Sequence, residues 1–320
     1  MKLEKRSIIT IVPTKPFNFD TTFYKPDHFT TDDHKYERGV RWQTMRWEGE
    51  KLGLKYEDKG SMKDPLLSVS VFSKEKLDSQ FLNRLKEEII YRYNLDLDLG
   101  DFYQASSKEP LLQKAIKQLE GMRPGHPSSL YEYLIVGIIL QNASVKRSIQ
   151  MFRNLLQKYG TELDFDDQKL LCLWDIGRFS EIEESELRAL KVGYRAKSII
   201  RVDQQFSQGS LSEERLRSSD LVDQKETLLS LYGVGPATVW YLLFDVFHRW
   251  EVFEHISPWE QKLYSQIFFR KDMVSVDELH KYIDKFGKYK QLAVHYMWEK
   301  IWWDRENGVV YDWLEKEIRV

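Results

Sequence analysis

Cysteine is almost absent from this sequence, since Cys172 is the one cysteine among 320 residues. A single cysteine excludes a disulfide framework, a zinc site built on cysteines and a four-cysteine iron–sulfur cluster. We therefore expect a cytoplasmic protein. Long apolar runs are also lacking: no stretch approaches eighteen residues, and Pro13 interrupts the run near the N-terminus. We expect neither a membrane span nor a signal peptide.

Net charge is low as well, because 48 basic residues face 50 acidic ones and leave −2. Any binding of nucleic acid must therefore come from a local basic patch. The 42% of hydrophobic and 31% of charged residues are ordinary for a globular protein with a substantial core. Aromatic residues are plentiful, with ten tryptophans. They suit a stacking pocket and would equally suit a large core.

The first 75 residues are rich in predicted β-structure. Their β-branched or alternating apolar runs predict strands at 7–12, 40–47, 52–56 and 66–72. The middle two can pair as a hairpin across 48–51. A helical pattern over 75–93 breaks at 94–102, where we place a domain boundary. The predicted fold is α+β, with a small antiparallel β domain with one helix at 1–100 and an all-helical domain at 101–320.

The second predicted domain consists of a succession of helices. Ser129 and Glu132 have the spacing of a capping box, in which each side chain bonds the other residue's backbone N–H, and they begin an apolar helix. A turn at 191–197 leads into a further helix. The other predicted helices, two of them short, are 111–119, 131–140, 145–159, 167–174, 184–189, 277–285 and 289–303.

Residues 227–266 are the stretch around which the chain is organised. An apolar helix end runs into Gly233-Val234-Gly235, and Pro236 then begins a second helix. Glycine permits positive φ and close backbone approach, and proline suits the first helical position. The exposed amides of such a helix N-terminus can bind a phosphate, although the same spacing also fits an ordinary packing corner. A second loop-to-helix junction, Ser257-Pro258-Trp259-Glu260, has the form of another capping box.

These motifs resemble the helix-hairpin-helix glycosylases with a Gly/Pro-rich loop and an active-site Asp, the HhH-GPD superfamily. The hairpin would occupy about 222–248. Within the superfamily, the sequence is most similar to the branch of 3-methyladenine DNA glycosylase II and 8-oxoguanine DNA glycosylase. The similar stretches are LYGVGPAT at 231–238, LEGMRPGHPSSLYEYLIVGIILQNAS at 119–144, KVGYRAK at 191–197 and FGKYKQLAVHYMWEKIWW at 286–303, which contains His295 and Trp298. The β-rich N-terminal part resembles the small antiparallel domain of that branch.

The resemblance implies a role for each side of the hairpin. Its backbone amides would bind a DNA phosphate, and its carbonyls would hold a structural K⁺ or Na⁺. The residues at the matching positions are Gly233, Gly235, Ala237 and Thr238 for the amides and Leu229, Leu231 and Val234 for the carbonyls. Phosphate contacts fix the register on double-stranded DNA without reading its sequence. We expect the binding of phosphate to need the permissive backbone of Gly235. We expect no other cofactor, and we expect the protein to be a monomer.

The resemblance also implies a wedge and a pocket. An enzyme that acts on a base in a duplex must extrude it and fill the gap. Asn142 matches the wedge, with Gln141 beside it, and an amide can bond a base edge. Tyr241 and Trp298, with Trp259 and Trp240 near them, would line the pocket and attract a cationic alkylated purine. The alternatives are a polar helix end for the wedge and core packing for the aromatic residues.

Ser257 occupies the position of the family's catalytic Asp. A carboxylate there stabilises positive charge on the sugar, whereas serine keeps the helix cap and lacks the charge. A nearby acid could substitute, the candidates being Glu254, Glu260 and Asp245. Alternatively, a cationic purine leaves with little help, or the protein is a catalytically inactive homologue that binds DNA or lesions. Ala237 replaces the family's nucleophilic Lys, so we expect a monofunctional base-excision repair glycosylase for alkylated purines.

Overall fold

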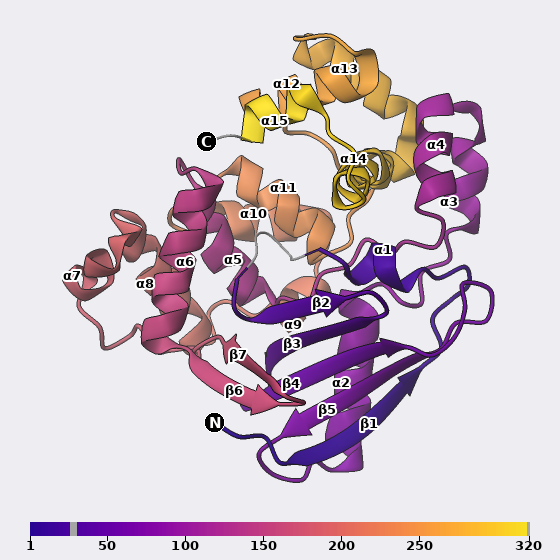
Figure 1. Cartoon of the computed structure of the whole chain (residues 1–320). Helices are drawn as coiled ribbons and strands as arrows, with labels where there is room; N and C mark the ends of the chain where they lie inside the picture. Colours follow the sequence, from indigo (N-terminus) through magenta and orange to yellow (C-terminus); the bar gives the residue numbers. More distant parts are fainter. Residues whose placement is uncertain (26–30, 319–320) are drawn as a thin grey trace.

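The computed structural model describes residues 1–25 and 31–318. The N-terminal part forms an antiparallel sheet of five strands in the order β1-β5-β4-β3-β2 (Figure 1). Phe81, Leu85 and Ile89 of helix α2 (Ser79–Arg92) pack on one face and form a core with the sheet. The strands are β1 (Lys5–Ile11), β2 (His34–Glu37), β3 (Val40–Trp47), β4 (Glu50–Asp58) and β5 (Leu67–Ser73).

The predicted hairpin between 40–47 and 52–56 is confirmed, with a tighter turn than expected. Trp47 pairs directly with Glu50, so the loop is only Glu48-Gly49. Both loop residues have positive φ, 45° and 83°. A two-residue loop of this kind matches the right-handed twist of the flanking strands.

The helix predicted at 167–174 is wrong, because this segment lies in a β-hairpin. Strand β6 (Thr161–Phe165) pairs with β7 (Gln168–Cys172) across Asp166-Asp167, whose φ angles are 47° and 59°. Leu170 and Cys172 are buried and Leu171 between them is less so, which is the period of a strand. Short apolar runs do not distinguish the two structures by periodicity. The hairpin packs on the N-terminal sheet, where Phe165 fills the space above Gly53.

Helices make up most of the rest of the chain, as predicted. The helix at Val145–Tyr159 has the expected bounds, and the capping box of Ser129 and Glu132 is formed. The helices are α1 (Phe19–Phe23), α3 (Gly100–Ala105), α4 (Pro110–Gln118), α5 (Leu130–Leu140), α6 (Val145–Tyr159), α7 (Glu184–Leu187), α8 (Arg195–Ser207), α9 (Glu213–Arg217), α10 (Leu221–Ser230), α11 (Pro236–Asp245), α12 (Pro258–Tyr264), α13 (Val276–Ile283), α14 (Lys290–Glu306) and α15 (Asp312–Ile318). No helix in the described ranges is long and apolar enough to cross a bilayer.

The helices form two hydrophobic cores. One is built mainly on α5, α6, α8, α10 and α11, and the other on α4, α12, α13 and α14. Helix α11 from the first core meets α14 from the second where Phe244 contacts His295, with ring centroids 4.9 Å apart. The division at residue 100 stays a prediction, because the β6–β7 hairpin from the second part packs on the sheet of the first.

His248 links the N-terminal part to the end of α11. Its ring packs at a tilt against Tyr91 of α2, with 4.4 Å between centroids, and its Nε2 is buried without a hydrogen-bond partner in the described structure. Burial, helped by nearby Arg217 and opposed by Glu88, lowers the pKa of His248 from 6.5 to about 4. Between these two pH values the unfolded chain binds a proton that the folded chain does not, so the folded state loses stability as pH falls.

We expect His248→Asn to flatten the acid dependence of stability. Asparagine tolerates the φ of 55° at this position and does not titrate. The wild-type protein should lose on the order of 1–3 kcal/mol more than the variant between pH 7 and pH 4.5, since one pKa unit corresponds to about 1.4 kcal/mol. Urea unfolding of both proteins at the two pH values measures this difference. Equal losses would show that His248 is not the group responsible.

Candidate functional site

The hairpin turn follows α10 and begins α11. Gly233 has a φ of +82°, and a Cβ added there would lie 2.2 Å from the Ser198 side-chain oxygen on α8. This glycine is therefore required both by its conformation and by the close approach of α8. Gly235 differs, because its φ is −111° and an added Cβ would meet nothing within 4 Å. The expected need for a permissive backbone at Gly235 is wrong; that need belongs to Gly233.

The backbone groups of the hairpin are arranged as a helix N-terminus. Gly235 is the N-cap of α11 and Pro236 its first residue, so the N–H groups of Ala237 and Thr238 lie in the first turn. Such N–H groups have no acceptor within the helix. On the other side, the carbonyl of Leu231 accepts a bond from Val234 N–H at 3.1 Å. Within the described residues, no backbone N–H bonds the carbonyl of Leu229 or Val234.

The loop that follows α5 is fastened to the hairpin. Gln141 donates a side-chain hydrogen bond to the carbonyl of Gly233, and Arg195 of α8 donates to the carbonyl of Gln141. Asn142 is exposed, with a φ of +48°, and its side-chain amide lies 3.3 Å from the Tyr194 hydroxyl. Gln141 thus has a structural contact, while Asn142 projects from the same surface as the hairpin.

Ser257 forms the predicted capping box at the start of α12. Its Oγ accepts from Glu260 N–H at 3.3 Å, and Glu260 Oε2 accepts from Ser257 N–H at 2.8 Å. The other carboxylate oxygen, Oε1, accepts a bond from the Tyr241 hydroxyl at 3.1 Å. Burial, followed by the charge of Glu260, raises the pKa of Tyr264 on the same helix. The Glu260 side chain is therefore held in place between Ser257 and Tyr241.

Of the four predicted pocket aromatics, Tyr241 bonds this carboxylate, and Trp259 and Trp298 contact each other. Trp259 is 40% exposed, and its ring meets that of Trp298 edge-on at 5.9 Å. Trp302, which we did not predict, extends the cluster at 5.4 Å from Trp298. The structure places Trp240 elsewhere: it packs against the core of α5, α8 and α10, with Lys225 Nζ 4.8 Å from its ring centroid.

The other two candidate acids have different surroundings. Glu254 has an exposed side chain that pairs with Lys225 at 2.9 Å, so it is a surface ion pair. Asp245 lies one turn after Tyr241 on α11 and accepts a hydrogen bond from the Tyr133 hydroxyl. Glu260 is the acid that has hydrogen bonds to both Ser257 and Tyr241.

A buried ion pair fastens α14, the helix that carries Trp298. Glu299 is fully enclosed, pairs with Lys25 and accepts a bond from the Tyr24 hydroxyl at 3.3 Å. His295, one turn earlier, lies against Phe244 of α11. Burial lowers the pKa of His295 to about 4, so the ring is neutral at pH 7. The pair and the neutral histidine fix the helix that carries Trp298.

Two contributors to the site were missed from sequence. Tyr264 is four residues after Glu260, and Trp302 is four residues after Trp298, so each lies on the same helix face as a residue already singled out. Helical spacing from the candidates would have found both. Tyr194, which touches Asn142, is the aromatic residue of the 191–197 turn and had no assigned role.

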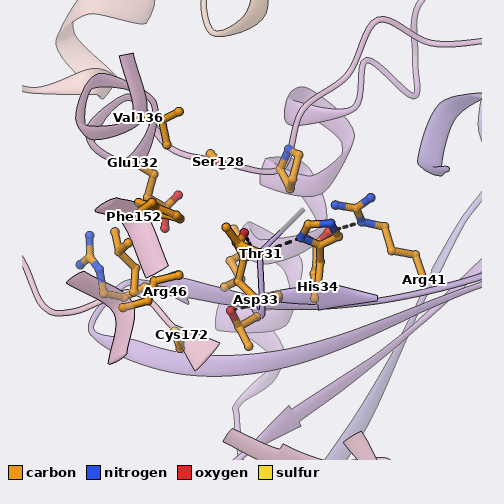
Figure 2. Close-up of a pocket in the computed structure, with 16 residues that line it drawn as sticks. Thr31, Asp33, His34, Arg41, Arg46, Ser128, Glu132, Val136, Phe152 and Cys172 are labelled. Atoms are coloured by element: carbon orange, nitrogen blue, oxygen red, sulfur yellow. Dashed lines mark hydrogen bonds and ion pairs between the residues drawn. The ribbon is translucent and has the colours of Figure 1, made fainter. Parts of the chain in front are cut away.

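A separate pocket lies where β3 faces α5, α6 and β7, and none of the predicted site residues lines it (Figure 2). Its polar groups bond one another: Asp33 accepts from Thr31 and lies 3.0 Å from the His34 ring nitrogen. Burial alone would raise the pKa of Asp33, but these hydrogen bonds outweigh it and lower the pKa. Burial raises the pKa of the Cys172 thiol to about 12, so this thiol is unreactive.

Comparisons with known proteins agree with the fold. No protein-family model matches the sequence. The chain is 25% identical over 190 residues to the DNA-3-methyladenine glycosylase of Bacillus subtilis, covering 56% of this chain and 63% of that protein. It is also 25% identical over 202 residues to a probable N-glycosylase/DNA lyase of Methanothermobacter thermautotrophicus, covering 57% and 64%. The match thus spans less than two thirds of each curated relative.

Solved structures match almost the whole chain. The 3-methyladenine DNA glycosylase of Archaeoglobus fulgidus superposes with a TM-score of 0.76 at 15% identity, covering 94% of this chain and all of that one. The 8-oxoguanine glycosylase/lyase of Clostridium acetobutylicum, in complex with double-stranded DNA, gives 0.68 at 19% identity, covering 97% and 100%. The curated and structural neighbours of this chain are named as DNA glycosylases, and the chain has the fold of the structural ones.

Proposed function

We propose that this protein is a monofunctional DNA glycosylase of base-excision repair. It binds double-stranded DNA as a monomer, flips an alkylated purine into the aromatic cluster and hydrolyses its N-glycosidic bond. The observation that carries the proposal is the Glu260 carboxylate bonded to both Tyr241 and the Ser257 cap, on the helix whose Trp259 contacts Trp298 of α14. A held anion and electron-rich rings suit a cationic base and a sugar that gains positive charge.

The proposed reaction breaks the bond between the sugar C1′ and the purine nitrogen. The bonding electron pair leaves with the purine, whose positive charge it neutralises, and water adds to C1′ and releases a proton. The Glu260 carboxylate, three residues from Ser257, stabilises the developing charge on the sugar. Hydrogen bonds from Tyr241 and from Ser257 N–H hold this carboxylate, so little reorganisation is needed as the charge develops. Glu254 instead pairs with Lys225, and Asp245 accepts a hydrogen bond from the Tyr133 hydroxyl.

The hairpin supplies the grip on DNA in this proposal. The amides of Gly233, Gly235, Ala237 and Thr238 bind a backbone phosphate at the N-terminus of α11. The carbonyls of Leu229, Leu231 and Val234 hold a monovalent cation, which fits because two of them accept no backbone hydrogen bond within the described chain. Ala237 offers no amine, so a Schiff-base lyase step is not part of the proposal.

The second candidate function is a DNA- or lesion-binding protein without catalysis, and Ser257 favours it. A base-release assay on methylated and 8-oxoguanine duplexes separates the two. Release of a methylated purine above the rate in the Gly235→Asp variant, which should not bind, supports the enzyme. Tight binding with no release from any of these duplexes would establish the binding protein instead.

Asn142→Ala should weaken base flipping while leaving the fold intact. The side chain is exposed at the tip of the loop, so its loss leaves no buried cavity. Without the wedge the gap in the duplex is unfilled, and extrusion should fall about tenfold, corresponding to loss of about 1.4 kcal/mol. Fluorescence of 2-aminopurine beside the lesion reports extrusion. Wild-type fluorescence at saturating protein would argue against Asn142 as the wedge, and Lys146→Ala on the same loop–helix junction serves as the control.

A further inference from the structure

Two basic residues of α8 stack on one tyrosine beside the hairpin turn. The Lys197 Nζ lies 5.2 Å from the centroid of the Tyr232 ring, and the Arg201 guanidinium carbon lies 4.1 Å from it. Tyr232 immediately precedes Gly233 and is 45% exposed. All three side chains are exposed to solvent. They form a cationic cluster on the surface, and we call Lys197, Arg201 and Tyr232 the α8 cluster.

No acid neutralises this cluster within residues 1–25 and 31–318. Basic residues on other helices have partners, such as Arg188 with Glu184 and Lys290 with Asp284. Lys197 and Arg201 are four residues apart on one helix, where like charges repel each other. The negative face of the tyrosine ring offsets part of that repulsion. A like-charged pair kept without an acid favours an anionic partner from outside the chain.

The cluster lies on the surface that carries the hairpin and the wedge loop. Ser198, between the two cations in sequence, packs directly under Gly233, so α8 is docked on the turn itself. One helical face carries Tyr194, Lys197 and Arg201, and Tyr194 contacts Asn142. The two cations are separated by about 6 Å along the helix axis. That distance is of the order of one to two nucleotide steps along a DNA strand, at ~3.4 Å each.

We propose that Lys197 and Arg201, held over Tyr232, bind the DNA phosphates that adjoin the phosphate bound by the hairpin amides. The inference rests on the proposed function only in that the partner is DNA. It concerns affinity and salt dependence, whereas base release depends on the separate site around Glu260. Tyr232 is a positioning residue that orders the two cations.

Salt dependence of DNA binding tests this inference. Each lost phosphate contact should reduce the slope of log affinity against log salt by about 0.9. Between 50 and 200 mM salt, the loss of affinity should therefore be about 3.5-fold smaller for Lys197→Gln than for the wild-type protein. For the double variant Lys197→Gln, Arg201→Gln it should be about 12-fold smaller. Fluorescence anisotropy with an undamaged duplex measures the slope. Lys197→Arg should retain the wild-type slope, because it keeps the charge.

Matched variants separate this outcome from general loss of charge. Lys285 stacks on Tyr282 at 5.0 Å, near α13, which Figure 1 shows well away from α8. Lys285→Gln should leave the slope unchanged, and Tyr232→Phe should behave as wild type because it keeps the ring. The inference about the α8 cluster is wrong if the salt slope is unchanged in the Lys197→Gln, Arg201→Gln double variant while Gly235→Asp still abolishes binding. That result would leave the proposed function standing. If instead the salt slopes change as expected but the wild-type protein releases no base, the proposed function is wrong and the inference about the α8 cluster stands.

Discussion

Ser257→Asp should raise the rate of base release by about 10²–10³-fold, the size of effect typical of one electrostatic contact to a transition state. The change places a carboxylate at the N-cap of α12, next to the Glu260 side chain that bonds Tyr241. Aspartate is as good an N-cap as serine, so the helix should form as before. Single-turnover release of a methylated purine from duplex DNA measures the gain.

Ser257→Asn is the matched control, because asparagine has the same shape and capping preference without the charge. It should leave the release rate near that of the wild-type protein. If Ser257→Asp is folded, binds DNA and releases no more base than wild type, the catalytic position has been misplaced. Glu260→Gln provides a second arm of the same experiment, since glutamine also serves in a capping box. It should lower release in the wild-type background and have a smaller effect once the Ser257→Asp carboxylate is present.

Gly235→Asp should weaken DNA binding by at least about 100-fold, since like charges placed together at an interface cost several kcal/mol. Gly235 is the N-cap of α11 with an ordinary φ of −111°, and the space around an added Cβ is open. The variant should therefore be at least as stable as wild type, because aspartate is a preferred N-cap residue. Anisotropy with an undamaged duplex measures affinity, and thermal unfolding measures stability.

Gly235→Asn separates charge from shape in this experiment. It caps the helix equally well and adds a similar volume without a negative charge. Most of the affinity should remain in this variant. Equal loss in Gly235→Asn and Gly235→Asp would mean that shape, and not phosphate repulsion, accounts for the effect. Unchanged binding in both variants would contradict the assignment of the hairpin as the phosphate site.

Local sequence signals were sufficient where the interaction is local. The capping boxes at Ser129 and Ser257 involve residues three apart, and the structure forms both. The helix at 145–159 has an amphipathic pattern with a period of 3.6 and a Gly160 stop, and its bounds are confirmed. The short apolar segment at 168–172 has no such signal. It forms a strand because its buried side chains, Leu170 and Cys172, pack in one core with Trp42 and Phe72 of the N-terminal sheet.

The sequence by itself determined the α+β order of elements, the hairpin, the helix caps and the absence of a carboxylate at Ser257. These features depend on neighbours along the chain or on residue identity. The tertiary structure decided which distant residues meet. Glu260 bonds Tyr241, Gln141 bonds the Gly233 carbonyl, and Trp240 faces a core instead of the tryptophan cluster. Such contacts depend on how α5, α11, α12 and α14 pack, because a helix apolar on two faces does not specify which face meets which partner.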